Sequence, residues 1–177
     1  MSSVTKGKRN TKSSLYIKTI LTRNVILPFH MLGANMEEIL FENISNQTEG
    51  KCIIEGFIKP GSIKLLNHTA GRVTDNGCSF KIIFEAYICR PVEGMKFKCL
   101  VKNITKAGIR AEREGKLSPV IVFIARDHNY NNKYFSTVKE NEKILVKVVG
   151  TRYELNDKYI SVLAELIETK KKKKIKI

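Results

Sequence analysis

The sequence predicts an α+β layer in its first half and an all-β barrel in its second half. Three observations support this: one stretch has a helical period, strand-like runs are separated by Pro and Gly turns, and almost no helical period occurs after Gly94. A chain of 177 residues can form two modules of about 80 residues, each with its own core. We expect a basic tail at 1–14, a first domain at 15–92, a second at 93–169 and a basic tail at 170–177.

The first half opens with a strand-like segment at residues 15–27, LYIKTILTRNVIL, which should stop near Pro28 because proline lacks a backbone N–H. A helix is expected after Gly33 and before Gly50. Its apolar residues recur at the spacing of a single amphipathic stripe: Met36, Ile39, Leu40 and Ile44.

Three further strands are expected in the first half, at 50–58, 62–74 and 79–89. Pro60-Gly61 and Asp75-Asn76-Gly77 are the turn signals between them. The order of strand, helix and antiparallel meander predicts a helix packed on one face of a sheet.

The second half begins with MKFKCLVKNI at residues 95–104, in which apolar residues alternate with lysines. This period of two predicts a strand with one buried face and one basic face. Four more strands are expected at 109–113, 117–125, 143–153 and 158–168. Five short strands with one longer connection, 127–142, between the third and fourth match an OB-type barrel, a fold that commonly binds oligonucleotides. A small β-domain without a ligand is the alternative.

The net charge of +15 is concentrated at the two ends of the chain. Lys6, Lys8, Arg9, Lys12 and six lysines after residue 169 supply ten of these charges, which leaves +5 for the body. Basic tails raise affinity for nucleic acid without selecting a sequence, although a solubilising or nuclear-import role is an equal alternative.

The sequence also indicates the cellular compartment and class of protein. No apolar run approaches the roughly 20 residues that span a bilayer, and the polar start does not resemble a secretory signal, so we expect an intracellular protein. The four cysteines lack a C-x-x-C pair, and neither a metal nor a cofactor is expected. No Walker loop, H-E-x-x-H or G-x-S-x-G motif is present, which favours a noncatalytic protein; a nuclease with scattered carboxylates is the remaining enzymatic alternative.

Three stretches carry a family resemblance: Cys89–Gly94 (CRPVEG), Pro119–Arg126 (PVIVFIAR) and Val149–Arg152 (VGTR), the last followed by Asn156-Asp157. In this order, across residues 15–168, they resemble the stalk subunit seven of DNA-directed RNA polymerase II. This family includes the archaeal E-prime type and versions from large DNA viruses. The first stretch is similar to the hinge between that family's two domains, and the second to its third barrel strand.

The resemblance implies an RNP-like tip domain followed by an S-one-type barrel. It also implies a noncatalytic subunit that acts in transcription, including initiation. Such a subunit docks on the polymerase core subunits through its tip, pairs with a subunit-four-like partner and offers its barrel to nascent RNA. The expected location is the nucleus, or the viral factory and virion for a viral protein. A free-standing OB-fold RNA-binding protein and the equivalent stalk subunit of RNA polymerase I or III are the alternatives.

Candidate RNA-binding residues lie in the second half. Barrels of this type carry aromatic residues for base stacking around the Gly that ends the first strand, but Ala107 and Ile109 flank Gly108 here. Phe123 on the third strand is a candidate stacking residue, but a core position is favoured for it. We therefore expect weak, salt-sensitive RNA binding dominated by charge. The candidate RNA contacts are Lys96, Lys98, Lys102, Lys106, Arg110, Tyr130 and Tyr134, with Phe135 as a further possible stacking residue. The candidate polymerase-docking loop contains Gly71, Arg72, Asn76 and Gly77.

Overall fold

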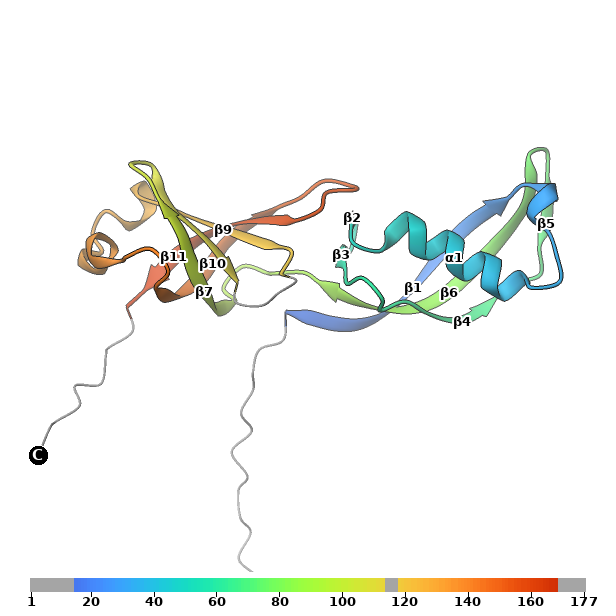
Figure 1. Ribbon diagram of the computed structural model, residues 1–177, viewed down its shortest axis with the longest axis horizontal. Coiled ribbons are helices and arrows are strands. Elements are labelled where there is room, and N and C mark those ends of the chain that lie inside the picture. Colours follow the sequence, from blue (N-terminus) through green and yellow to red (C-terminus); the bar gives the residue numbers. More distant parts are fainter. Residues whose placement is uncertain (1–14, 114–117, 169–177) are drawn as a thin grey trace, which may run out of the picture.

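The computed structural model describes residues 15–113 and 118–168, in which a helix-covered sheet and a closed barrel lie end to end (Figure 1). We call the sheet and its helix the N-terminal layer, and the five strands β7–β11 the barrel. The tails expected at 1–14 and 170–177 lie outside the described residues.

The N-terminal sheet is built on one long strand, β6 (Gly77–Cys89). Strand β1 (Tyr16–Leu27) pairs with it antiparallel along its whole length, from Tyr16 opposite Cys89 to Leu27 opposite Cys78, with no register shift. The other side of β6 pairs in succession with three short strands. These are β5 (Arg72–Thr74), β4 (Lys64–His68) and β3 (Gly56–Ile58), and β2 (Cys52–Ile53) pairs outside β3.

A short 3-10 turn, η1 (Phe29–Met31), leads from β1 to the helix α1 (Met36–Thr48), which lies where the sequence predicts it. Leu40 and Ile44 of the predicted stripe are fully buried against the sheet, while Met36 and Ile39 pack at the margin of the same core. Acidic side chains in the first turn of α1 place negative charge near the positive end of the helix dipole, which stabilises the helix. The α+β class predicted for this half is confirmed.

The helix end is joined to the following turn by Glu49. Its carboxylate accepts hydrogen bonds from three consecutive backbone N–H groups, those of Gly61 at 2.9 Å and of Ser62 and Ile63 at 3.2 Å. Hydrogen bonds to a charged carboxylate are stronger than those between neutral groups, so these three bonds hold the direction of the backbone in the turn. The turn predicted at Pro60-Gly61 is therefore anchored to the helix.

Two strands expected from the sequence are divided in the structure. The segment 50–58 is the hairpin β2–β3, which turns before Gly56, a residue with φ +135 whose added Cβ would lie 2.6 Å from the Cys89 carbonyl oxygen. The segment 62–74 is β4 and β5, which pair with different parts of β6. The apolar pattern continues through both breaks, so strand length could not be read from it.

The barrel closes in the order β10-β11-β9-β8-β7, with β9 and β11 parallel and the other neighbours antiparallel. In chain order this places the fifth strand between the third and fourth, which is the OB-type arrangement and confirms the predicted fold. The 3-10 turns η2 (Asp127–Asn129) and η3 (Lys133–Thr137) occupy the long connection. The strands are β7 (Lys96–Ile104), β8 (Gly108–Arg113), β9 (Val120–Ala125), β10 (Lys143–Arg152) and β11 (Ile160–Ile167).

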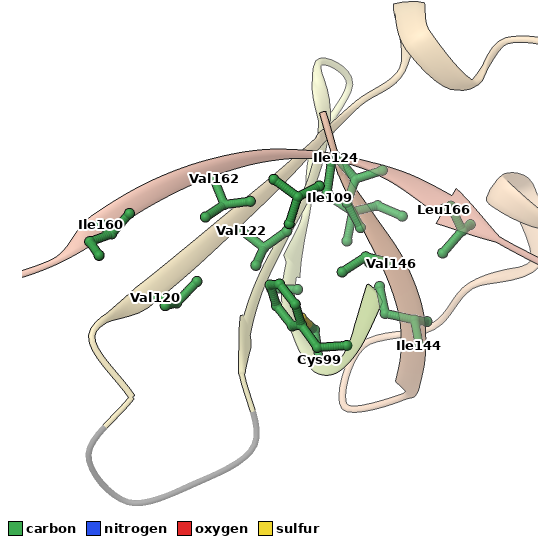
Figure 2. Packing of buried hydrophobic residues seen from close by; sticks show 14 of the residues in the cluster. Cys99, Ile109, Val120, Val122, Ile124, Ile144, Val146, Ile160, Val162 and Leu166 are labelled. Carbon is green, nitrogen blue, oxygen red and sulfur yellow. The ribbon is translucent and has the colours of Figure 1, made fainter. Parts of the chain in front are cut away.

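Buried side chains from all five strands meet inside the barrel, including Val122, Ile144 and Val162 (Figure 2). The same core continues into the N-terminal layer through Cys52, Phe57 and two further residues, Leu15 and Cys89. Two backbone hydrogen bonds of 2.8 Å join Cys52 to Asn156 and Asp157 in the β10–β11 turn. The layer and the barrel are thus held together by shared packing and by main-chain pairing.

In the described part of the chain, no helix is long and apolar enough to span a bilayer. Within the same residues, no three His, Cys, Asp or Glu side chains are grouped to hold a metal ion.

Candidate nucleic-acid interface

Strand β7 presents a basic outer face. Phe97, Cys99 and Val101 are buried in the barrel, and the alternate residues point outward. The outward residues Lys96, Lys98 and Lys102 are all exposed. The alternation read from the sequence therefore places these three lysines on one face, as strand geometry requires.

A β-bulge modifies this face at Lys102. The pairing of β7 with β8 shifts register between Val101 and Asn103, which inserts one extra residue. Lys102 and Asn103 are consequently both exposed, and Asn103 lies opposite Arg110. The Lys102 Nζ lies 3.9 Å from Glu112 Oε2 with both side chains nearly half exposed. An ion pair of this kind contributes little free energy, so Lys102 can exchange it for a phosphate.

Strand β10 brings two more lysines beside β7. Lys147 lies directly opposite Lys96, and Lys143 lies opposite Leu100. Like charges at opposite positions of a sheet repel each other, and a bound polyanion would relieve that repulsion. Lys147 also lies 3.9 Å from Glu165 Oε2, a half-exposed contact. This contribution could not be read from the sequence, because β10 and β7 are far apart along the chain.

An exposed aromatic ring lies on the neighbouring strands. Phe123 of β9 pairs with Arg110 of β8 and is 40% exposed, so the prediction that it is a core residue is wrong. An added Cβ at Gly108 would lie 3.0 Å from the Phe123 ring and 2.4 Å from the Ile124 carbonyl oxygen. Gly108 thus leaves room for the ring. The flanking Ile109 is fully buried and provides no stacking surface.

The other predicted RNA contacts differ in accessibility. Lys106 is exposed in the turn between β7 and β8, and Tyr130 after η2 is 79% exposed beside a shallow depression of about 540 Å³. Tyr134 is half-buried against the core, and its hydroxyl lies 3.2 Å from Glu142 Oε1. Phe135 is buried under the Arg126 guanidinium, so its ring does not offer a free face for stacking.

The predicted docking loop forms the β5–β6 hairpin at the far end of the N-terminal layer (Figure 1). Arg72 and Asn76 are exposed. Gly71 packs closely on the core, because an added Cβ would lie 2.4 Å from Cys78 Sγ. Gly77 has φ +147, and a Cβ there would lie 2.2 Å from the Leu27 carbonyl oxygen. The two glycines therefore shape the hairpin, whereas the two polar residues face solvent.

Several exposed apolar residues lie at this end of the layer, with Val73 and Ile26 on opposite faces of the sheet. Val73 is 73% exposed and Phe29 is 53% exposed, and the neighbouring residues Ile26, Met31 and Leu32 are also exposed. Grouped exposed apolar residues are typical of protein-binding surfaces. We call these five residues the apolar end. None of them is among the residues predicted from the sequence, which are limited to the turn residues of the loop.

Three thiols lie where the layer meets the barrel, and none of them suits nucleophilic chemistry. Burial raises the pKa of Cys52 to about 11, and that of Cys89 and Cys99 to about 12, although Arg113 opposes the increase for the last two. A thiol that stays protonated at neutral pH is a poor nucleophile.

The chain is similar along most of its length to a protein of a large DNA virus. No protein-family model matches the chain. The chain is 28% identical, over 174 aligned residues, to the provisionally assigned DNA-directed RNA polymerase subunit L376 of Acanthamoeba polyphaga mimivirus. The alignment covers 89% of this chain and 84% of the viral protein, so the similarity spans both the N-terminal layer and the barrel.

Proposed function

We propose that this chain is a subunit of a multisubunit DNA-directed RNA polymerase. The observation that carries the proposal is the similarity to the mimivirus polymerase subunit, which extends over 89% of the chain. A match across both structural parts argues against the mere sharing of a common barrel.

More specifically, we propose a noncatalytic stalk subunit of the subunit-seven type. Its N-terminal layer is the tip domain that docks on the polymerase core, and its barrel contacts nascent RNA. A subunit-four-like protein pairs with it, and the site of action is the nucleus or a viral factory. Support comes from the OB-type barrel at the C-terminal end and from the order of the CRPVEG, PVIVFIAR and VGTR stretches.

The barrel face supports an RNA-contacting role. Lys96, Lys98, Lys143 and Lys147 lie along the seam of β7 and β10, while Arg110 and Phe123 lie on β8 and β9. Lysines attract phosphates without distinguishing sequence, and an exposed ring can stack on any base. Binding at this face is therefore expected to be sequence-tolerant and sensitive to salt.

The apolar end supports a docking role. Val73 and Phe29 are more than half exposed, beside the hairpin that carries Arg72 and Asn76. We propose that this end packs against the polymerase core, with apolar burial giving affinity and Arg72 giving orientation.

Affinity purification of the tagged full chain from its native cell, followed by mass spectrometry, tests this proposal. Co-purification of the large polymerase subunits and of one small stalk partner is expected. A Phe29→Ser, Val73→Ser double variant should lose the large subunits, whereas Ile54→Ser, Leu155→Ser, which changes two exposed apolar residues elsewhere, should retain them. Recovery of the chain without any polymerase subunit would contradict the proposal. The identity of the large subunits separates polymerase II from its relatives.

The second candidate is a free-standing OB-fold RNA-binding protein, which the basic barrel face with Phe123 would also suit. Such a protein should bind RNA tightly in the absence of any other polypeptide. A purified chain with nanomolar affinity for single-stranded RNA and no polymerase association would favour it.

A further inference from the structure

Strand β1 forms a long open edge of the N-terminal sheet. Among the described residues it pairs only with β6, over twelve consecutive positions and without a bulge. In Figure 1, β1 runs beside β6 along the N-terminal layer. No backbone hydrogen bond of residues 18–26 to a described segment other than β6 is present.

The pairing of β6 shows which backbone groups of β1 face outward. The Tyr87 carbonyl accepts from Lys59 N–H and its N–H donates to Ser62 Oγ, so both groups of Tyr87 point away from β1. Lys81 likewise exchanges bonds with Thr69 on that side. Positions opposite such residues are non-hydrogen-bonded pairs, in which both strands direct their N–H and C=O groups away from each other.

Tyr87 lies opposite Lys18, and Lys81 lies opposite Asn24. Because the ladder has no shift, the even-numbered residues of β1 all direct their N–H and C=O groups to the open edge. A bond from Arg23 Nη1 to the Thr22 carbonyl, 3.0 Å long, agrees with this assignment. The residues concerned are Lys18, Ile20, Thr22, Asn24 and Ile26.

The side chains along this edge are apolar enough to hold another strand. Ile20 is 62% exposed and Ile26 is 57% exposed, both on the even-numbered face. Ile17, on the other face, is 57% exposed. Natural sheets protect long edges with proline, bulges or dense charge; residues 16–27 contain no proline and only two charged residues, Lys18 and Arg23.

Charge indicates what kind of strand fits. The even-numbered face of the sheet carries Lys18, Lys64 and Lys81 but only one acid, Glu85, which already pairs with Lys18 at 2.9 Å. A second copy of this chain would add the same lysines to the edge and carries a net charge of +15. A segment with carboxylates on that face would instead meet complementary charge.

We propose that the β1 edge accepts an extended, acidic segment of a different polypeptide as an additional strand. That segment places apolar side chains opposite Ile20 and Ile26 and a carboxylate opposite Lys18. Main-chain bonds to residues 18–26 supply the affinity, and the alternate side chains supply specificity, as in other cases of strand addition. The edge is independent of the polymerase role, so failure of either proposal leaves the other standing.

The test uses the full chain and a capped nonapeptide designed to lie antiparallel to residues 18–26. The peptide has valine opposite Ile20 and Ile26 and glutamate opposite Lys18. In the free protein, amide hydrogen exchange should be fast at Ile20, Thr22 and Asn24 and slow at the intervening residues. Saturating peptide should protect the three fast amides.

N-methylation of the peptide distinguishes binding by backbone pairing from binding by simple apolar contact. Methyl groups on the peptide nitrogens opposite Thr22 and Asn24 should weaken binding by about tenfold or more, because each removes a bond to β1. Methyl groups on the nitrogens opposite Leu21 and Arg23, which point away, should have little effect. A peptide with lysine in place of glutamate should bind more weakly, and this difference should shrink with added salt.

A matched pair of protein variants tests the same edge. Thr22→Pro removes an outward N–H and should weaken peptide binding, while Thr22→Val keeps that N–H and should bind as the parent does. Slow exchange at the odd-numbered amides of β1 shows that each variant is folded. Equal effects of the two methylation patterns would overturn the proposal. Two further results would also overturn it, since the chain would then cover its own edge. One is protection of the even-numbered amides in the free monomer. The other is protection that rises with protein concentration while the measured mass shifts to that of a dimer.

Discussion

Phe123 on β9 and Arg110 on β8 lie directly opposite each other on the outer face of the barrel. Opposite positions in an antiparallel pair bring side chains within contact distance. An exposed ring beside a guanidinium can stack on a base while the cation meets the adjacent phosphate. The aromatic platform expected in such barrels lies near the end of the first strand, whereas this pair lies on the second and third strands.

Replacement of Phe123 by Ala should lower affinity for a single-stranded RNA by about 5- to 150-fold, because one stacked base contributes roughly 1–3 kcal/mol. Phe123→Tyr keeps an aromatic ring and should bind as the parent does. Fluorescence anisotropy with a labelled oligouridine measures both. If the Phe123→Ala variant bound RNA with the affinity of the parent, the bases would have to contact another part of the protein.

The combined Lys96→Ala, Lys98→Ala, Lys102→Ala variant should bind RNA more weakly and with a smaller dependence on salt. Three lost phosphate contacts reduce the slope of log affinity against log salt by about two, at roughly 0.7 for each contact on a single strand. Titrations at several salt concentrations measure the slope. The variant Lys51→Ala, Lys64→Ala, Lys81→Ala loses the same charge from the N-terminal layer, and it should keep the parental slope. Equal slopes in all three proteins would move RNA contact away from this face.

Gly77→Ala should lower the free energy of unfolding by about 2 kcal/mol or more. The new Cβ would lie 2.2 Å from the Leu27 carbonyl oxygen, and φ is +147 at this residue. Gly150→Ala is the matched control, since no atom lies within 4 Å of its added Cβ. Urea denaturation compares the two. A Gly77→Ala protein as stable as the control would show that the β1 end and the hairpin are not packed this closely.

Stability should decrease as the pH rises above about 9. Burial raises the folded-state pKa of Cys89 and Cys99 from 9.0 to about 12, and that of Cys52 to about 11. The folded protein then holds protons that the unfolded chain releases. This contribution is complete below pH 9 and is lost as the pH approaches the folded-state pKa values. Urea midpoints at pH 7, 9 and 10 measure the loss, and Cys99→Ala should reduce the pH dependence. A midpoint that is constant to pH 10 would contradict the burial of these thiols.

Much of the fold could be predicted from local sequence patterns. The stripe of Leu40 and Ile44 fixed the position of α1 because a helix repeats every 3.6 residues. The alternation around Cys99 fixed the outward face of β7, since strand side chains alternate. Five strands and one long connection were sufficient to predict the barrel.

The functional surfaces depended on tertiary structure. The run VIVFIA of β9 is apolar throughout, so its pattern could not show that Phe123 faces outward while Val122 and Ile124 face the core. The barrel must close before Lys147 lies opposite Lys96, because their strands are about fifty residues apart. The open edge of β1 likewise depends on which strands flank β6. Sequence determines periodicity along a strand, because that is local geometry; which side is covered, and by what, is decided only by contacts between distant segments.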